Sequence, residues 1–126
     1  MCKVVFYKCL KCGNLVAAIY ESGVPMICCG EPMSLLKANV VEASQEKHIP
    51  VVTRDGATLR VTVGSVEHPM LPEHFIQWIF LETKNGWQRK CLSAGDKPEA
   101  VFALTEDTPV SVYEYCNLHG LWKVDL

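Results

Sequence analysis

The sequence predicts an all-β protein, in which a small metal-binding module precedes an antiparallel β-sandwich. From Ile49 onward, short runs of β-branched and aromatic residues alternate with turn signals such as Arg54-Asp55-Gly56 and Asn85-Gly86. Strands with turns at this spacing are typical of a sandwich. Earlier in the chain, cysteines cluster in two pairs, which indicates a metal module. No stretch has a convincing helical period of apolar residues.

Length and composition limit the classes of protein that fit. A chain of 126 residues is long enough for one domain with a small appendage. No apolar run approaches the ~20 residues that span a bilayer, and the N-terminus lacks a basic-then-apolar signal peptide. We therefore expect a cytoplasmic protein with no membrane partner. The net charge of −2 argues against nucleic acid as a partner.

The chain divides into a metal module over 1–37, a connector over 38–47 and a sandwich domain over 48–126. The connector lacks a clear hydrophobic period. The expected strands cover residues 15–20, 51–53, 58–63, 75–81, 87–92, 100–105, 110–115 and 121–124. Alternation places Leu59, Val61 and Val63 on one face of their strand. It likewise places His74, Ile76, Trp78 and Phe80 on one side.

The cysteine spacing favours a metal site with four thiolate ligands. Seven cysteines cannot all form disulfides, and a reducing cytosol disfavours pairing. Cys9 and Cys12 form a C-x2-C turn followed by glycine, and Cys28 and Cys29 are adjacent. Neighbouring side chains on a strand point to opposite faces, so we expect the adjacent pair in a turn. Zinc or a single iron fits four thiolates. The alternatives are buried free thiols or a redox-active disulfide between the adjacent cysteines.

A second candidate metal site combines all four histidines with Cys116. Cys116 and His119 are three residues apart, and Gly120 follows them. His48, His68 and His74 stand at predicted strand ends or loops, beside prolines. Taken singly, each histidine is more often a satisfied surface or core residue than a ligand. Loops at one edge of a sandwich can converge, so we expect these five side chains to share a metal.

Five ligands of these types indicate redox chemistry rather than a structural role. A structural zinc site takes four ligands, so a fifth suits an octahedral metal with one open position. If the imidazoles form a plane, the thiolate lies on one axis and the open position on the other. A thiolate in that place increases electron density at the metal, as in thiolate-ligated haem enzymes. Such a site is suited to a small oxygen species.

The chain resembles desulfoferrodoxin, the two-iron form of superoxide reductase, over nearly its whole length. The segments that carry the resemblance are Cys9-Leu10-Lys11-Cys12, Cys28-Cys29-Gly30-Glu31-Pro32-Met33, Glu46-Lys47-His48-Ile49-Pro50, Gly64-Ser65-Val66-Glu67-His68-Pro69-Met70, Pro72-Glu73-His74 and Cys116-Asn117-Leu118-His119-Gly120. The resemblance implies a desulforedoxin-like iron module before an immunoglobulin-like catalytic domain. It also implies two non-haem irons per chain, one with four cysteine ligands and one with four histidines and a cysteine.

The implied activity is the one-electron reduction of superoxide to hydrogen peroxide at a ferrous site, using an external electron donor, in oxidative-stress detoxification. The resemblance further implies rubredoxin or a similar small carrier as the donor, and a homodimer. It gives Lys47 the role of attracting the anion, and Glu46 that of closing onto the oxidised iron. Without the resemblance, Glu46 and Lys47 read more simply as a solvated charged pair.

Other predictions and other functions stay open at this point. Cys2 and Cys91 have no ligand counterpart and are expected to be free thiols, and Glu67 and Glu73 to be surface residues. The tryptophans are expected in core or interface packing; they are Trp78, Trp87 and Trp122. The alternatives to a reductase are a non-catalytic iron electron-transfer or metal-binding protein, a zinc-dependent structural protein, and a true dismutase that releases dioxygen.

Overall fold

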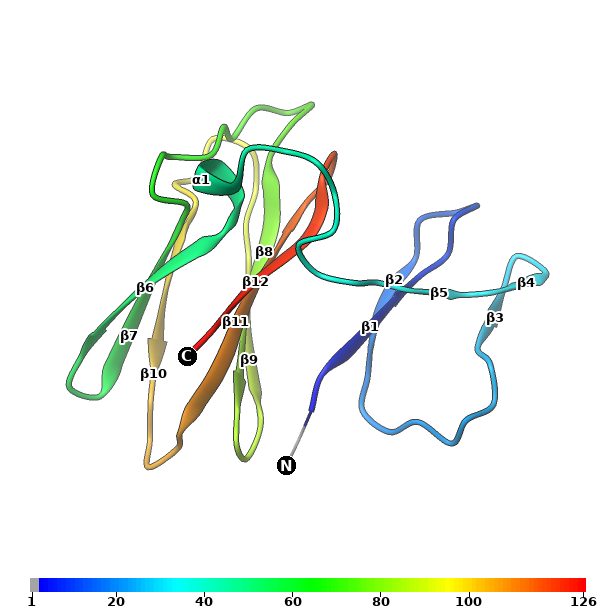
Figure 1. Ribbon diagram of the computed structural model, residues 1–126, viewed down its shortest axis with the longest axis horizontal. Helices are drawn as coiled ribbons and strands as arrows, with labels where there is room; N and C mark the ends of the chain where they lie inside the picture. The colour runs from blue at the N-terminus through cyan, green and yellow to red at the C-terminus, as the bar shows by residue number, and fades with distance from the viewer. Residues whose placement is uncertain (1–2) are drawn as a thin grey trace.

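The computed structural model describes residues 3–126 and consists of a small N-terminal part beside a larger β-sandwich (Figure 1). Cys2, one of the predicted free thiols, lies outside the described residues. The N-terminal strands are β1 (Val5–Lys8), β2 (Leu15–Ala18), β3 (Ile27–Cys28), β4 (Glu31–Pro32) and β5 (Ser34–Leu35). In the described residues, β1 lies between β2 and β5 in one antiparallel sheet, and β3 pairs with β4. The predicted strand over 15–20 is present but ends two residues early.

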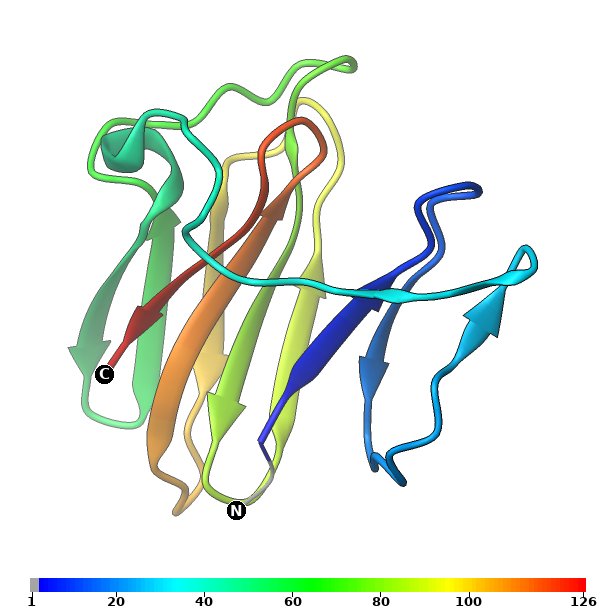
Figure 2. The same ribbon diagram turned by 45° about the vertical axis from the view of Figure 1, so that its right-hand side comes forward.

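The sandwich follows the antiparallel pattern that the sequence predicts. Its strands are β6 (Pro50–Asp55), β7 (Thr58–Val63), β8 (Ile76–Thr83), β9 (Trp87–Cys91), β10 (Glu99–Ala103), β11 (Pro109–Cys116) and β12 (Gly120–Asp125). Among the described residues, one sheet has the order β10-β7-β6 and the other the order β12-β11-β8-β9. The two sheets face each other across a common core, as the two views show (Figures 1 and 2).

A short helix, α1 (Gln45–His48), interrupts an otherwise all-β arrangement of the described residues. Four residues make only about one helical turn, which is too short to produce a hydrophobic period. The helix also crosses the predicted boundary between the connector and the sandwich domain. In the described part of the chain, no helix is long and apolar enough to cross a membrane.

The core between the two sheets confirms one predicted face and corrects another. Leu59, Val61 and Val63 all lie in this core, as alternation predicts. Ile76 lies there too, whereas Trp78 and Phe80 point to the opposite side of the sheet. The pairing of β8 with β11 is irregular at this point: Trp78 faces Tyr115 and Ile76 faces Cys116, so that Gln77 has no opposite residue. Such a bulge reverses the side on which the next side chain points.

The N-terminal part packs on the outer face of the sheet that contains β8 and β11. Phe6 is 3% exposed and contacts Trp78, Phe80 and Tyr113, with ring centroids 5.1–5.4 Å apart. At one margin of this aromatic cluster, the Lys8 ammonium donates a hydrogen bond of 2.9 Å to the hydroxyl of Tyr115. The cluster is large and apolar, so burial of its rings is the main attraction between the two parts.

In the connector, the side chain of Asn39 forms two hydrogen bonds with the backbone of β12. The Asn39 amide accepts a hydrogen bond from the Lys123 N–H at 2.8 Å and donates one to the Lys123 carbonyl at 3.1 Å. From there the chain runs to α1 at the end of the sandwich drawn at the top of Figure 1. The loop after β7 and the turn between β11 and β12 reach the same end. Segments far apart in the sequence therefore meet there.

We expect Phe6→Ala to lower the free energy of unfolding by about 3 kcal/mol, because it leaves a cavity in a buried aromatic cluster. Urea unfolding followed by tryptophan fluorescence measures this. Val101→Ala is the control; its side chain is 47% exposed on β10, so the change should stay below about 0.5 kcal/mol. Equal effects of the two substitutions would contradict the packing described for Phe6.

Candidate metal centres

The loops at one end of the sandwich bring together the histidines and the cysteine that the sequence analysis grouped. His48 ends α1, His68 follows β7, His74 precedes β8, Cys116 ends β11, and His119 lies in the turn before β12. Each offers one nitrogen or sulfur, and these atoms all lie within 4.8 Å of one another. The prediction that five residues distant in sequence converge is therefore met in the geometry.

The four imidazoles form a closed ring. His48, His68, His74 and His119 follow one another around it, with neighbouring centroids 4.7, 4.7, 5.1 and 4.9 Å apart. Each ring is nearly perpendicular to the next, at 78–85°. This arrangement lets every imidazole direct one nitrogen toward the centre without stacking on its neighbour.

Hydrogen bonds to carbonyls determine which nitrogens face the centre. Nδ1 of His48 donates to the Ser44 carbonyl at 2.7 Å, and Nδ1 of His68 donates to the Pro69 carbonyl at 2.6 Å. A carbonyl only accepts, so Nδ1 carries the proton and Nε2 keeps a free lone pair in the neutral ring. The two Nε2 atoms are only 3.2 Å apart. Two lone pairs facing each other repel, and a shared cation removes this repulsion.

The protonation of these side chains also suits a cation. Burial lowers the pKa of His48 and of His74, and it lowers the pKa of His68 to about 4, so the rings are neutral at pH 7. The buried Nε2 of His74 has no hydrogen-bond partner within residues 3–126. An orphaned buried nitrogen is costly unless something binds it, and a metal ion fulfils that requirement.

The thiol of Cys116 lies on the side of the four imidazoles that faces away from solvent. Cys116 is 0% exposed, and its Sγ lies 3.8 Å from Nδ1 of His119. A cavity of about 320 Å³ opens onto the four histidines and Lys47, but Cys116 does not line it. A metal at the centre would thus be covered by the cysteine and reachable from the opposite side.

Glu46 and Lys47, the two charged residues before His48, lie differently with respect to the cavity. Lys47 is exposed and lines the cavity, whereas Glu46 is exposed and does not. The Glu46 carbonyl accepts hydrogen bonds from Val66 N–H at 2.9 Å and from the Ser65 hydroxyl at 3.2 Å. The backbone that carries the pair is thus held by the loop leading to His68. The catalytic roles of Glu46 and Lys47 stay predictions.

Sequence reasoning missed three contributors to this site. Trp122, expected only in packing, stacks on His48 at 4.9 Å and donates its indole N–H to the His119 carbonyl at 3.1 Å. A Cβ on Gly64 would lie 2.6 Å from the Glu46 carbonyl oxygen, so only glycine lets α1 approach its supporting loop. Asn117 bonds to the backbone on both sides of His74. Both Gly64 and Asn117 stand inside motifs with ligand candidates, but spacing alone does not reveal their contacts.

The four clustered cysteines converge at the N-terminal part. Cys9 and Cys12 flank the turn after β1, and Cys28 and Cys29 lie at the turn between β3 and β4. These turns lie together on the side away from the sandwich (Figure 2). The four sulfurs lie within 4.8 Å of one another. As predicted, the adjacent cysteines occupy a turn, in which Cys29 has a φ of 53°.

Backbone and side-chain N–H groups point at these sulfurs. Cys12 N–H lies 3.5 Å from Sγ of Cys9, and Asn14 N–H lies 3.4 Å from Sγ of Cys12. The Cys12 N–H and the Lys11 N–H lower the pKa of Cys9 to about 6. Hydrogen bonds with Cys12, Cys9 and Cys28 raise the pKa of Cys29 to about 12. Four thiolates this close need a cation to ionise together, and a tetrahedral zinc or iron ion fits.

The described cysteines are all free, so the alternative of a redox disulfide between Cys28 and Cys29 is not the state seen here. Cys91 is exposed on β9 and belongs to neither cluster, as predicted for a free thiol. Both donor sets therefore match the predicted groups. Histidine with thiolate suits iron in one site, and four thiolates suit iron in the other.

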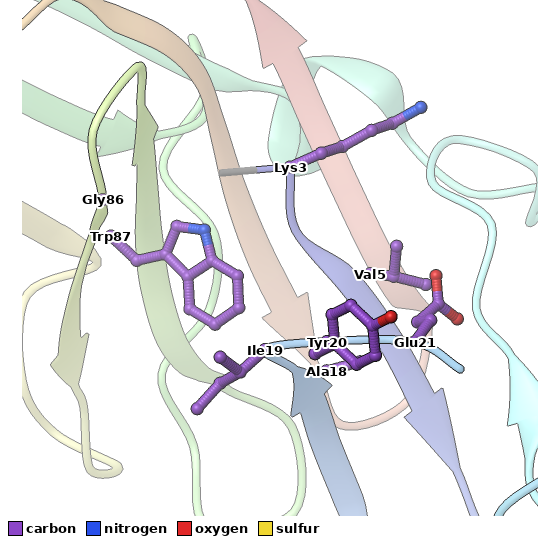
Figure 3. Close-up of a pocket in the computed structure, with 8 residues that line it drawn as sticks. All are labelled: Lys3, Val5, Ala18, Ile19, Tyr20, Glu21, Gly86 and Trp87. Carbon is purple, nitrogen blue, oxygen red and sulfur yellow. The ribbon is translucent and has the colours of Figure 1, made fainter. Parts of the chain in front are cut away.

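A separate cavity lies away from both clusters. It measures about 580 Å³ and lies between β2 and the hairpin of β8 and β9. Figure 3 shows Ile19, Tyr20 and Trp87 around it, with Lys3 and Glu21 at its margins. Within residues 3–126, no imidazole or thiol lines it.

Known proteins match the chain in both parts. The family model described as desulfoferrodoxin matches residues 40–125, and that of the desulfoferrodoxin N-terminal domain matches residues 3–36. A desulfoferrodoxin of Syntrophotalea carbinolica is 50% identical over 121 residues, covering 96% of this chain and 95% of that protein. A superoxide reductase of Pyrococcus abyssi is 32% identical over 96 residues, covering 62% of this chain and 84% of that protein. The crystal structure of the superoxide reductase from Treponema pallidum is similar with a TM-score of 0.81 and 40% identity, over 98% of this chain and 99% of that one.

We expect the metal-free protein to lose stability as the pH falls from about 6.5 toward 4.5. The pKa values of His48, His68 and His74 are lowered in the folded state, so the unfolded chain binds more protons in this range. The stability is therefore present above the unfolded pKa and lost as the pH falls toward the folded one. Urea unfolding midpoints in the presence of a chelator measure it.

His68→Gln should flatten this pH dependence, because it removes the ring whose pKa is lowered to about 4. A midpoint that does not change with pH across this range in the unsubstituted protein would contradict the burial argument.

Proposed function

The chain belongs to the desulfoferrodoxin family, and from this premise we propose that it is a superoxide reductase. It reduces superoxide to hydrogen peroxide with one electron and two protons, and an external donor returns the electron. The observation that carries the proposal is the ring of four imidazoles with a buried thiol on one side and an open cavity on the other. A filled electron-transfer site would not need that opening.

We assign the two donor sets to the two irons that the family implies. The four-cysteine cluster binds iron centre I, with ligands Cys9, Cys12, Cys28 and Cys29. The histidine ring and thiol bind iron centre II, with ligands His48, His68, His74, Cys116 and His119. The iron of centre II, when bound, supplies the electron that superoxide takes up. The fit rests on the neutral imidazoles and on the orphaned Nε2 of His74.

The chain's own residues bind the anion and keep the ligands in place. Lys47 contributes a positive charge at the cavity that leads to the four rings, which attracts superoxide and would stabilise negative charge that develops on it. The carbonyls of Ser44 and Pro69 hold His48 and His68 in the tautomer that directs Nε2 inward. Burial of Cys116 keeps water away from the sulfur on the closed side.

Glu46 is proposed as the carboxylate that closes onto the oxidised site. Its backbone lies beside the cavity, but its side chain is exposed and does not line it. Closure therefore requires the side chain to turn inward from its present position, which its exposure to solvent permits.

We propose the division 1–37, 38–47 and 48–126 for the domains, and the separate family matches over 3–36 and 40–125 support a break after the metal module. Rubredoxin or a similar small carrier is the proposed donor. The cytoplasm is the proposed location, because the described cysteines are free and grouped for metal rather than paired.

The family resemblance also supports a homodimer. A candidate surface for this dimer borders the cavity of Figure 3, where Ile19 is 90% and Tyr20 86% exposed and where β2 is an edge strand among the described residues.

The proposed activity predicts that Cys116→Ser and His119→Ala each abolish superoxide reduction, because each removes a ligand of the reacting metal. The visible spectrum of the four-cysteine centre should stay unchanged, since it lies in the other part of the chain. Hydrogen peroxide formation from generated superoxide, with simultaneous measurement of dioxygen, separates reduction from dismutation.

Cys91→Ser is the matched control for the cysteine substitution and should keep full activity, because Cys91 lies outside both clusters. Full activity of either ligand variant would overturn the proposal. Release of dioxygen without an added reductant would instead identify a dismutase.

Lys47→Met should lower the second-order rate constant for superoxide by about 10-fold and weaken its dependence on ionic strength. The positive charge at the cavity draws the anion in, and salt screens this attraction. Pulse radiolysis at several salt concentrations measures both quantities. Lys84→Met makes the same change of charge at the hairpin of β8 and β9, away from the cavity, and should have little effect. Equal effects of the two would remove Lys47 from the mechanism.

A further inference from the structure

We propose that Asn117 is the residue that positions His74 in the five-ligand site, through hydrogen bonds to the peptide groups on both sides of it. The inference rests on the proposed function in one respect, namely that His74 is a metal ligand. It adds that the turn carrying Cys116 and His119 also sets the place of His74. Asn117 touches no reacting atom, so it is a positioning residue.

His74 lacks the ring hydrogen bond that orients two of the other histidines. His48 and His68 each donate from Nδ1 to a carbonyl, at 2.7 and 2.6 Å. Within the described residues, Nε2 of His74 has no partner, and its Nδ1 makes no such bond to a carbonyl. His74 is also less buried than His48 and His68. Apart from its ring contacts with His68 and His119, its position therefore depends on how its backbone is held.

The backbone at His74 is held from two sides. Its own N–H and carbonyl bond to the carbonyl and N–H of Leu71, at 3.0 and 2.9 Å. The Asn117 side chain holds the flanking residues: Oδ1 accepts from the Phe75 N–H at 2.9 Å, and Nδ2 donates to the Glu73 carbonyl at 3.0 Å. The Leu71 bonds close a short exposed loop on itself, whereas the Asn117 bonds connect that loop to the turn that carries Cys116 and His119.

The end of the β8–β11 pairing explains why a side chain takes this role. The ladder ends with Cys116 opposite Ile76, and the chain then turns toward His119. Beyond this pair, the backbone bond from Asn117 N–H to the Phe75 carbonyl measures 3.2 Å, which is longer than the two bonds that the Asn117 side chain makes. A carboxamide has a donor and an acceptor in one plane, as a peptide group does. Asn117 thus extends the pairing by one step, to the residues that flank His74.

A displaced ligand is expected to bind its metal less tightly. Residues that orient metal ligands from the outer shell typically account for about 10- to 100-fold in metal affinity or activity. Removing the Asn117 carboxamide leaves the loop with its internal Leu71 bonds, the Gly95 N–H bond to the Met70 carbonyl and the Asn117 N–H bond to the Phe75 carbonyl, and none of these holds Glu73. The metal should then leave the site faster, and the energy of the Cys116 thiolate-to-ferric charge-transfer band should shift, because the position of His74 among the ligands would change.

The test uses the full-length, iron-loaded protein and follows the thiolate-to-ferric band of the five-ligand site while a chelator removes iron. Asn117→Ala should raise the rate of iron loss about 10-fold or more and shift the band. Asn117→Asp keeps an acceptor for the Phe75 N–H and loses the donor to Glu73, so its effect should be smaller. Asn39→Asp is the matched control: it loses an equivalent donor, to the Lys123 carbonyl, and should change neither quantity.

A double-mutant cycle with His74→Ala separates positioning from general stability. In the His74→Ala background, Asn117→Ala should add no further change in the rate or the band, because the residue it positions is gone. The same fold increase in both backgrounds would overturn the inference, and so would an unchanged rate and band in Asn117→Ala alone. If the unsubstituted protein shows no thiolate-to-ferric band at all, the proposed iron site itself fails.

Discussion

The antiparallel pairing of β8 with β11 is the constraint on which the rest of the structure depends. Its inner face supplies Ile79, Leu81 and Val112 to the core between the sheets. Its outer face presents the aromatic side chains on which Phe6 packs. Its last pair sets Cys116 opposite Ile76, at the end where the histidines gather. One ladder thus joins the sandwich, the N-terminal part and the candidate iron site.

The bulge at Gln77 lets one strand serve both sides of the sheet. Without it, strict alternation would place Ile76 with Trp78 and Phe80 on the outer face. With it, Ile76 enters the core beside Cys116, while the aromatic residues stay outside. On either side of the bulge, β8 therefore pairs with β11 in a different register. Ile76 can point into the core next to the candidate metal site while Trp78 and Phe80 point to the outer face.

Ligand placement in the five-ligand site relies on backbone groups and carboxamides more than on charged partners. Carbonyls orient His48 and His68, the indole of Trp122 bonds to the His119 carbonyl, and Asn117 holds the peptides beside His74. Burial lowers the pKa of His48, His68 and His74, so these three imidazoles are uncharged at pH 7. Lys47 is then the cation at the cavity, which suits the capture of an anion.

The sequence by itself determined the β-sandwich, most strand positions and both donor sets, because each leaves a local trace. Alternation over 58–63 marks a strand, and cysteine or histidine spacing marks ligands. Only the tertiary structure decided the one-turn helix α1, the bulge at Gln77, and the roles of Trp122, Gly64 and Asn117. These depend on contacts between segments that are distant in sequence, and a single turn or a single inserted residue has no periodicity to read. The identity of the ligands is thus a local property of the chain, whereas their orientation is a property of the fold.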